Sequence, residues 1–256
     1  MDNSCPCFSL NGLTICLLLI GKMSIKRGNP WGQFGERPLI APSLLACDFV
    51  RVGEQIAAAA DADLFHVDIM DGHFVPNLSM GPGFVKSVRA FTNRPLDVHI
   101  MVTDPAYFAD RFAQVGADSI TFHIEATDKP EEIIDFLHDK GLGAGVSIKP
   151  ATPAEAIKGI IDKVDVVLVM TVEPGYGGQT FMRDQLSKIS QVRSMLPDGV
   201  RLEVDGGINP TTAALAAQAG ADVFVAGVNV FGSNDIDGAI KALRNAVIEA
   251  RKKRSG

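Results

Sequence analysis

Short apolar runs alternate regularly with longer segments of helical periodicity from Pro38 onward. The apolar runs are short, rich in β-branched residues and bounded by Gly, Pro or Asp, which is typical of buried strands. Eight strands are expected, beginning at Leu39, Leu64, Leu96, Ser119, Gly143, Asp165, Val200 and Asp222.

The segments between the apolar runs predict helices, for example over residues 50–62, 104–116, 152–162 and 209–220. Several begin with Asp, Thr or Asn followed by Pro, and several end at Gly, as helix starts and stops do. Eight strand and helix pairs without a change of composition predict a single (β/α)8 TIM barrel. A doubly wound open sheet is the alternative, weakened because no G-x-G-x-x-G turn follows the first strand.

The barrel is expected to occupy residues 37–256, with residues 1–36 as an extension outside the fold. The apolar stretch Leu13–Ile20 is too short to span a bilayer. Met23 follows it closely, so residues 1–22 are interpreted either as a mis-assigned start or as a targeting segment.

Composition narrows the class of protein further. The 256 residues are 46% hydrophobic and carry a net charge of −6, with a pI near 5.4. These values predict an ordinary globular protein and argue against nucleic acid or a membrane as partner. Four cysteines in a chain of this length do not suggest a disulfide framework. A reducing compartment, the cytoplasm, is expected, with organelle targeting left open.

Ionisable residues interrupt two of the apolar runs. His66, Asp68 and Met70 alternate along the second expected strand, and His99 and Met101 along the third. Alternate residues share one face of a strand, and in a TIM barrel the carboxyl ends of the strands carry catalytic groups. Asp205 ends the seventh strand, so two imidazoles and two carboxylates are expected to converge there.

A lone histidine in a strand is usually a hydrogen-bonded core residue, and a lone aspartate at a strand end is usually a helix cap. Four such residues at one depth favour a bound cation, because unpaired buried charge costs several kcal/mol. Two imidazoles with two carboxylates suit zinc, iron, manganese or cobalt better than calcium or magnesium.

Glycines gather in the three connections expected after the last three strands. Glycine lets a backbone N–H approach a ligand closely, and the last loops of TIM barrels commonly bind phosphate. The connections that contain "EPGYGGQTF", "DGGINP" and "AGVNVFG" are expected to carry no Lys or Arg before their helices, so mainly backbone donors would hold a phosphate. The alternative is that these glycines only make tight turns.

The stretches "APSLLACDF", "HVDIMDGHFVPNLSMGP", "DVHIMV", "VLVMTVEPGYGGQTF", "EVDGGI" and "VAGVNVFG" resemble the ribulose-phosphate 3-epimerase family, in order from about Leu39 to Ile248. The resemblance implies a homo-oligomeric barrel that interconverts D-ribulose 5-phosphate and D-xylulose 5-phosphate in the pentose phosphate pathway or the Calvin cycle. It also implies dependence on a metal, and one divalent ion per subunit is expected, Zn²⁺ before Fe²⁺, Mn²⁺ or Co²⁺.

Residue by residue, the resemblance implies metal ligands at His66, Asp68, His99 and Asp205, with Asp68 and Asp205 as base and acid. It implies substrate contacts at Ser43, His99, Gly175, Tyr176, Gly177, Gly178, Asp205, Gly206, Gly207, Gly227 and Val228. Where the family usually has Ser or Thr, this chain has Val228, so a side-chain hydrogen bond to phosphate is missing. Met70, Met101 and Met170 are expected either to line the site or simply to fill the core.

Three alternatives stay open at this point. An epimerase of another ketose phosphate, such as allulose 6-phosphate, would share all four ligands. A sugar-acid phosphate decarboxylase would carry D-x-K-x-x-D where this chain has "HVDIMD". A barrel that binds phosphate without catalysis would need neither metal nor turnover.

Overall fold

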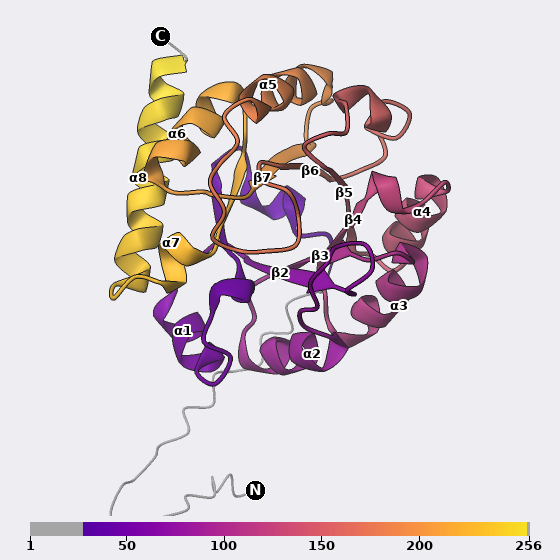
Figure 1. Cartoon of the computed structure of the whole chain (residues 1–256), viewed down its shortest axis with the longest axis horizontal. Coiled ribbons are helices and arrows are strands. Elements are labelled where there is room, and N and C mark those ends of the chain that lie inside the picture. Colours follow the sequence, from indigo (N-terminus) through magenta and orange to yellow (C-terminus); the bar gives the residue numbers. More distant parts are fainter. Residues whose placement is uncertain (1–27, 255–256) are drawn as a thin grey trace, which may run out of the picture.

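A ring of eight parallel strands surrounded by helices makes up the computed structural model, which describes residues 28–254 (Figure 1). The strands are β1 (Leu39–Pro42), β2 (Phe65–Met70), β3 (Leu96–Met101), β4 (Ser119–His123), β5 (Gly143–Ile148), β6 (Val166–Met170), β7 (Arg201–Asp205) and β8 (Val223–Ala226). They are hydrogen-bonded in the order β1-β8-β7-β6-β5-β4-β3-β2. A parallel bridge between Ser43 and His66 joins the two ends of this order. The structure therefore confirms the predicted barrel and contradicts the alternative of an open sheet.

The helices follow the strands around the outside of the barrel. They are α1 (Val52–Ala58), α2 (Pro82–Phe91), α3 (Pro105–Val115), α4 (Pro130–Asp139), α5 (Gln185–Met195), α6 (Pro210–Ala219), α7 (Val228–Phe231) and α8 (Ile236–Arg254). Short 3₁₀ helices lie at η1 (Trp31–Phe34), η2 (Leu44–Ala46), η3 (Ile124–Ala126) and η4 (Ala154–Ile157). Asp104 and Asn209 cap α3 and α6 through their side chains, as their sequence positions predicted.

The prediction of a helix over residues 152–162, after β5, is wrong. The backbone of this segment forms only η4 and further short-range bonds, such as Lys158 N–H to Glu155 O and Ile160 N–H to Ile157 O. These bonds close three-residue turns rather than α-helical ones. Gly159 lies within the segment, and glycine disfavours a continuous α-helix.

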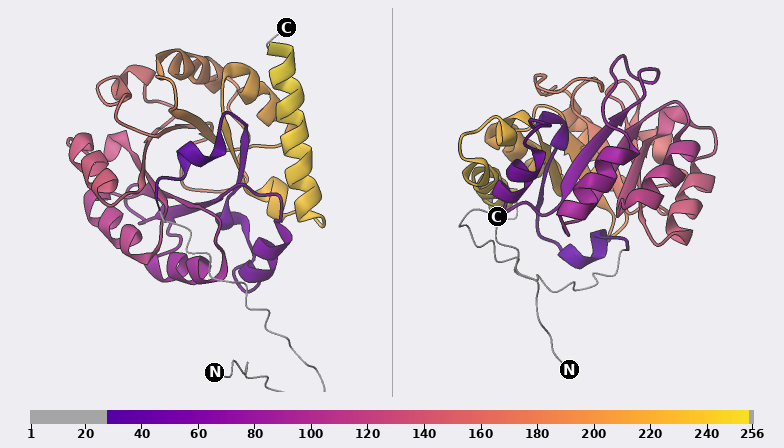
Figure 2. Two further views of the ribbon diagram at one scale, coloured as in Figure 1. Left: turned by 180° about the vertical axis from the view of Figure 1, so that it is seen from behind. Right: turned by 90° about the horizontal axis from the view of Figure 1, so that it is seen from below.

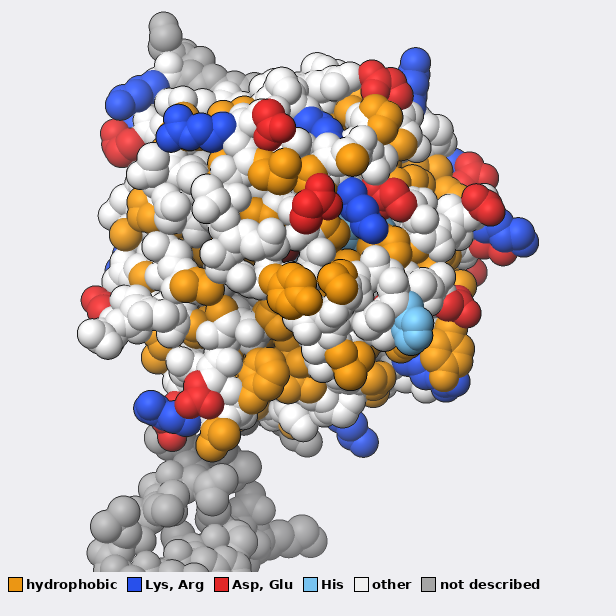
Figure 3. Space-filling view, viewed as in Figure 1, with side chains coloured by type: hydrophobic (Ala, Val, Ile, Leu, Met, Phe, Trp, Pro, Cys, Tyr) orange, Lys and Arg blue, Asp and Glu red, His pale blue; other side chains and the backbone are white. Residues whose placement is uncertain are grey.

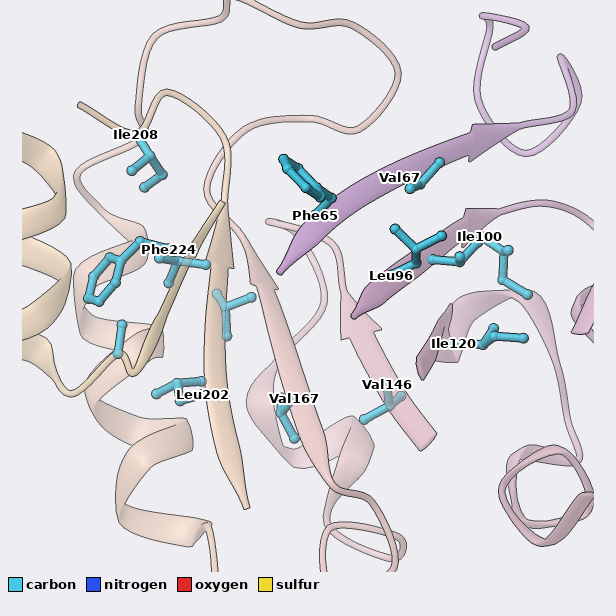
Figure 4. Packing of buried hydrophobic residues seen from close by; sticks show 14 of the residues in the cluster. Phe65, Val67, Leu96, Ile100, Ile120, Val146, Val167, Leu202, Ile208 and Phe224 are labelled. Atoms are coloured by element: carbon cyan, nitrogen blue, oxygen red, sulfur yellow. The ribbon is translucent and has the colours of Figure 1, made fainter. Parts of the chain in front are cut away.

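Two apolar layers follow from the alternation of side chains along each strand. Residues facing outward from the strands pack beneath the helices; those labelled in Figure 4 include Phe65, Leu96 and Phe224, all fully buried. A second cluster extends from the amino end of the barrel along its interior and comprises Trp31, Leu39, Ala41, Leu64, Val166, Val223 and Val225. The barrel interior is therefore filled at its base and leaves room only at the carboxyl ends of the strands.

The base of the barrel is closed by the chain before β1. Trp31 is 3% exposed and its indole N–H donates to Ser119 Oγ at 3.1 Å. The views in Figure 2 show this indigo segment at the end opposite the loops that face the viewer in Figure 1. The fold thus includes residues that were expected to lie in an extension of residues 1–36. The expectation for residues 1–27 concerns residues outside the described part of the chain.

Within residues 28–254, no helix is both long enough and apolar enough to cross a membrane.

Candidate active site

Two strands side by side and a third across the barrel bring the predicted metal ligands together. His66 and Asp68 lie on β2, His99 on β3 and Asp205 at the end of β7. The strand register pairs Asp68 directly with His99. One ligand atom from each of the four residues lies within 4.8 Å of the others. His66 and His99 are fully buried, Asp68 is 3% exposed, and Asp205 is partly open to the cavity above.

Asp68 is at the centre of the contacts in this cluster. His66 Nε2 and His99 Nδ1 each lie 3.3 Å from Asp68 Oδ1. The Ser43 hydroxyl donates a hydrogen bond of 2.6 Å to Asp68 Oδ2. His66 Nε2 is buried and makes no hydrogen bond to any described residue. A buried ring nitrogen beside the Asp68 carboxylate, without a hydrogen-bond partner among the described residues, fits a metal ligand, and the mixed N and O ligands fit a transition metal.

The charge on each member of the cluster is set by burial and by its neighbours. Burial disfavours protonated His66, but the carboxylates of Asp68, Asp97 and Glu203 outweigh it and raise the pKa of His66. Burial of Asp68 is likewise outweighed by the two imidazoles, which lower the pKa of its carboxyl. Burial and the Asp68 carboxylate together raise the pKa of Asp205 to about 7. Two carboxylates with unequal proton affinities are what a base and acid pair requires.

A second buried group lies beneath the ligands, towards the base. His66 Nδ1 is 2.9 Å from Asp97 Oδ2, and Glu203 Oε1 is 3.6 Å from the same nitrogen. Asp97 and Glu203 are fully buried, and neither oxygen of Glu203 has a hydrogen-bond partner among the described residues. Burial and the nearby Asp97 raise the pKa of Glu203 to about 8. His66, Asp97 and Glu203 are also close enough to hold a cation, but His66 is shared with the first cluster.

The role of Asp97 was missed in the sequence analysis. The pattern that could have shown it is the alternation of Asp97, His99 and Met101 along β3, which places all three inside the barrel. An Asp that accepts from one nitrogen of an imidazole orients the other nitrogen towards a metal.

A cavity of about 550 Å³ opens above the cluster. The lining includes these predicted residues: Ser43, Asp68, Met70, Met101, Met170, Gly175, Tyr176, Gly177, Gly178, Asp205, Gly206, Gly207, Gly227 and Val228. His99, predicted both as a ligand and as a substrate contact, is fully buried and does not line the cavity. Asn77, Asn209 and Asn229 line it and were not predicted. Figure 3 looks onto this end of the molecule, where hydrophobic side chains gather near the centre.

Two connections from opposite sides meet at the mouth of the cavity. The side chain of Asn77, in the connection between β2 and α2, donates a hydrogen bond of 2.9 Å to the backbone oxygen of Gly175, in the connection between β6 and α5. The Tyr176 hydroxyl donates to Pro76 O at 3.4 Å. In Figure 1 the orange connection after β6 crosses the face of the barrel towards β2. These contacts join the connections after β2 and β6 at the rim of the cavity.

Backbone groups dominate the end of the cavity nearest β7 and β8. Gly207 has a φ of 65°, and a Cβ there would lie 2.4 Å from Phe181 N. Glycine is therefore required where this turn meets the connection after β6. No Lys or Arg lines the cavity. Arg183 precedes α5 in the same connection, so the expectation of no basic residue before this helix is wrong, but Arg183 lies outside the lining. Uncharged donors are therefore what the cavity offers an anion: backbone N–H groups and the side-chain amides of Asn209 and Asn229.

Comparison with known proteins agrees with this geometry. The model of the Ribulose-phosphate 3 epimerase family matches residues 39–231. A relative named ribulose-phosphate 3-epimerase from Mycobacterium tuberculosis is 48% identical over 210 residues, covering 81% of this chain and 92% of the relative. A protein of the same name from Bacillus subtilis is 42% identical, covering 81% and 98%. One from Schizosaccharomyces pombe is 44% identical, covering 83% and 95%.

Solved structures with the same fold are more distant in sequence. A 3-hexulose-6-phosphate synthase has a TM-score of 0.64 at 19% identity, covering 81% of this chain and 99% of that one. A 3-keto-L-gulonate-6-phosphate decarboxylase from Vibrio cholerae has a TM-score of 0.66 at 18% identity, covering 83% and 98%. At this identity the likeness shows the barrel fold alone.

Proposed function

The chain belongs to the ribulose-phosphate 3-epimerase family, and from this membership we propose that it interconverts D-ribulose 5-phosphate and D-xylulose 5-phosphate by epimerisation at C3. The observation that carries the proposal is the placement of Asp68 and Asp205. They extend from β2 and β7, across the barrel from each other, into one cavity. Inversion at a carbon needs one group to remove a proton from one face and another to deliver a proton to the opposite face.

We propose that His66, Asp68, His99 and Asp205 hold one divalent ion, zinc being favoured by two nitrogen and two oxygen ligands. Bound there, the ion would act as a Lewis acid towards the substrate oxygens. His66 Nε2, which makes no hydrogen bond within residues 28–254, supports this ligand set. Iron, manganese and cobalt suit the same donors, and metal analysis of the purified protein distinguishes them.

The chain's own residues account for the remaining requirements of the reaction. From D-ribulose 5-phosphate, Asp68 takes the C3 proton, which leaves an enediolate, and Asp205 delivers a proton to the opposite face. The roles exchange in reverse. Met70, Met101 and Met170 line the cavity with apolar, polarizable groups that exclude water. The glycine connections after β6, β7 and β8 bind the phosphate through backbone N–H groups.

Exchange with heavy water tests these roles separately. In Asp205→Asn, Asp68 can still remove the C3 proton of D-ribulose 5-phosphate, so deuterium should enter that substrate without epimerisation. In Asp68→Asn, the same exchange should be seen only with D-xylulose 5-phosphate. Turnover should fall by orders of magnitude in both variants. The metal content of each variant is measured alongside, so that loss of the ion is not read as loss of a base.

Two results would overturn the proposal. One is near-normal epimerisation by either variant when its metal content equals that of the unaltered protein. The other is complete retention of the original C3 proton in the product of the unaltered enzyme, which would indicate a single shuttling base.

The expectations of a homo-oligomer and of a cytoplasmic location remain predictions. Sedimentation velocity of the purified protein tests the first, and cell fractionation tests the second.

A further inference from the structure

His99 has its two ring nitrogens in different surroundings. Nδ1 faces the metal cluster, 3.3 Å from Asp68 Oδ1, and Nε2 lies 2.9 Å from Nε2 of His123. His123 in turn places Nδ1 3.1 Å from Glu125 Oε2. Both imidazoles are fully buried, and their rings stack with centroids 5.0 Å apart. A continuous chain of contacts therefore runs from the cluster through β4 to a carboxylate at the rim of the barrel.

The contact between the two imidazoles restricts where their protons lie. A hydrogen bond between two ring nitrogens contains one proton, and a neutral imidazole carries only one. In the first arrangement His99 donates from Nε2, so His123 must carry its proton on Nδ1 and donate it to Glu125. In the second, His123 donates from Nε2, which leaves a lone pair on its Nδ1 facing the Glu125 carboxylate.

Glu125 is held in a position that favours the first arrangement. Its Oε1 accepts from the backbone N–H of Lys149 at 2.8 Å and from the Thr152 hydroxyl. Partial burial opposes ionisation of Glu125, but the contact with His123 and the hydrogen bonds from the Lys149 N–H and the Thr152 hydroxyl outweigh it and lower the pKa of Glu125 to about 2. An ionised carboxylate opposite an imidazole lone pair is repulsive, whereas the same carboxylate opposite N–H is a charge-assisted hydrogen bond.

The first arrangement leaves His99 Nδ1 without a proton, which is the state that a metal ligand needs. Asp68 favours the second arrangement while the cluster holds no cation, because its Oδ1 can accept from a protonated His99 Nδ1. Glu125 opposes this preference from the other end of the chain of imidazoles. The population of the ligating tautomer is thus set by two carboxylates on opposite sides of His99.

We propose that Glu125, acting through His123, selects the tautomer of His99 that presents a free lone pair on Nδ1 to the metal ion. Glu125 and His123 are positioning residues, because His99 and His123 separate Glu125 from the reacting atoms. The inference rests on the proposed function, since it takes His99 to be a metal ligand.

The experiment compares Glu125→Gln with the unaltered chain. Glutamine keeps a polar group at the rim but can either accept from or donate to His123, so it removes the preference for one tautomer. Ring ¹⁵N shifts of the metal-free protein report the tautomers directly, and the chain has only five histidines to assign. We expect a smaller fraction of His99 with the proton on Nε2, and zinc binding that is about 10- to 100-fold weaker by competition with a chelator.

Ser147→Ala is the matched control. Ser147 is the register partner of His123 on β5, is fully buried, and its Oγ has no hydrogen-bond partner in the described chain. Its removal alters the same layer of the barrel without touching the chain of imidazoles, so the tautomer and zinc affinity should not change. Equal losses of zinc affinity in Ser147→Ala and Glu125→Gln would overturn the inference, because they would indicate a general loosening of the barrel.

His99→Ala separates the two levels of the proposal. If zinc affinity survives in His99→Ala, the proposed ligand set fails. If His99→Ala abolishes zinc binding while Glu125→Gln leaves both the His99 tautomer and the zinc affinity unchanged, the ligand set stands and the role of Glu125 is refuted.

Discussion

Replacing Trp31 with alanine should destabilise the whole barrel, although Trp31 precedes the first strand. The indole is 3% exposed and packs among the inward-facing residues at the base. A buried Trp removes about 150–250 Å² from water, which at about 25 cal/mol per Å² corresponds to about 4–6 kcal/mol. Measured Trp to Ala substitutions in cores cost about 3–5 kcal/mol. The free energy of unfolding should therefore fall by about 4 kcal/mol, a large part of the roughly 5–15 kcal/mol typical of a domain.

Urea denaturation followed by far-ultraviolet circular dichroism measures this loss. Trp31→Phe is the graded control, because it keeps an aromatic ring but removes the N–H that donates to Ser119 Oγ. Ser119→Ala leaves the indole N–H without its partner and should cost about 1–3 kcal/mol. The double variant completes a cycle that isolates the hydrogen bond. A loss below about 1 kcal/mol in Trp31→Ala would refute the view that the segment before β1 is part of the core.

Three further predictions concern the site. The metal-free protein should lose stability as pH rises from about 4.5 to about 8, because Glu203 and Asp205 have folded-state pKa values raised to about 8 and about 7. Thermal unfolding at several pH values checks this. Glu203→Gln should weaken the dependence of the unfolding temperature on pH. Gly207→Ala should raise KM and lower stability, since its Cβ would meet the Phe181 backbone. Gly177→Ala is the control, because Gly177 has open space around it and a φ outside the strained range; this variant should unfold at the same temperature as the unaltered protein. Val228→Ser adds a hydroxyl in the cavity, where Val228 is 56% exposed, and should lower KM several-fold in steady-state assays, with an unchanged or higher KM as the contradicting result.

The strands and the convergence of the four candidate ligands could be predicted because both follow from local rules. Each of the eight expected strands forms within two residues of its predicted start. His66 and Asp68 share a face because they are two residues apart on one strand, and parallel strands bring His99 and Asp205 to the same end of the barrel. The position of the site depends on alternation and topology, which the sequence contains.

The features that were missed depend on contacts between distant residues. Trp31 is a single large apolar residue in a stretch with Gly and Pro, so no periodicity marks it as part of the core. Whether the segment around Gly159 is an α-helix or a series of turns depends on how it packs after β5. The partner of His66 is Asp97 on the neighbouring strand, and such a pair is visible only once the register of β2 and β3 is known.

Strand β4 links the base of the barrel to the site, although none of its residues is a proposed ligand. Its inward residues Ser119, Thr121 and His123 contact Trp31, Asp97 and His99 in turn, from the closed end to the open end. Beneath Ser119 the base is closed by Trp31 and its apolar neighbours, which keep water out of the interior and strengthen the electrostatic contacts above them. The buried carboxylates can therefore hold imidazoles in fixed orientations, which they could do only weakly in water. The contact of Ser119 with Trp31 at the base and the contact of His123 with His99 at the site are two consequences of the same inward-facing alternation along β4.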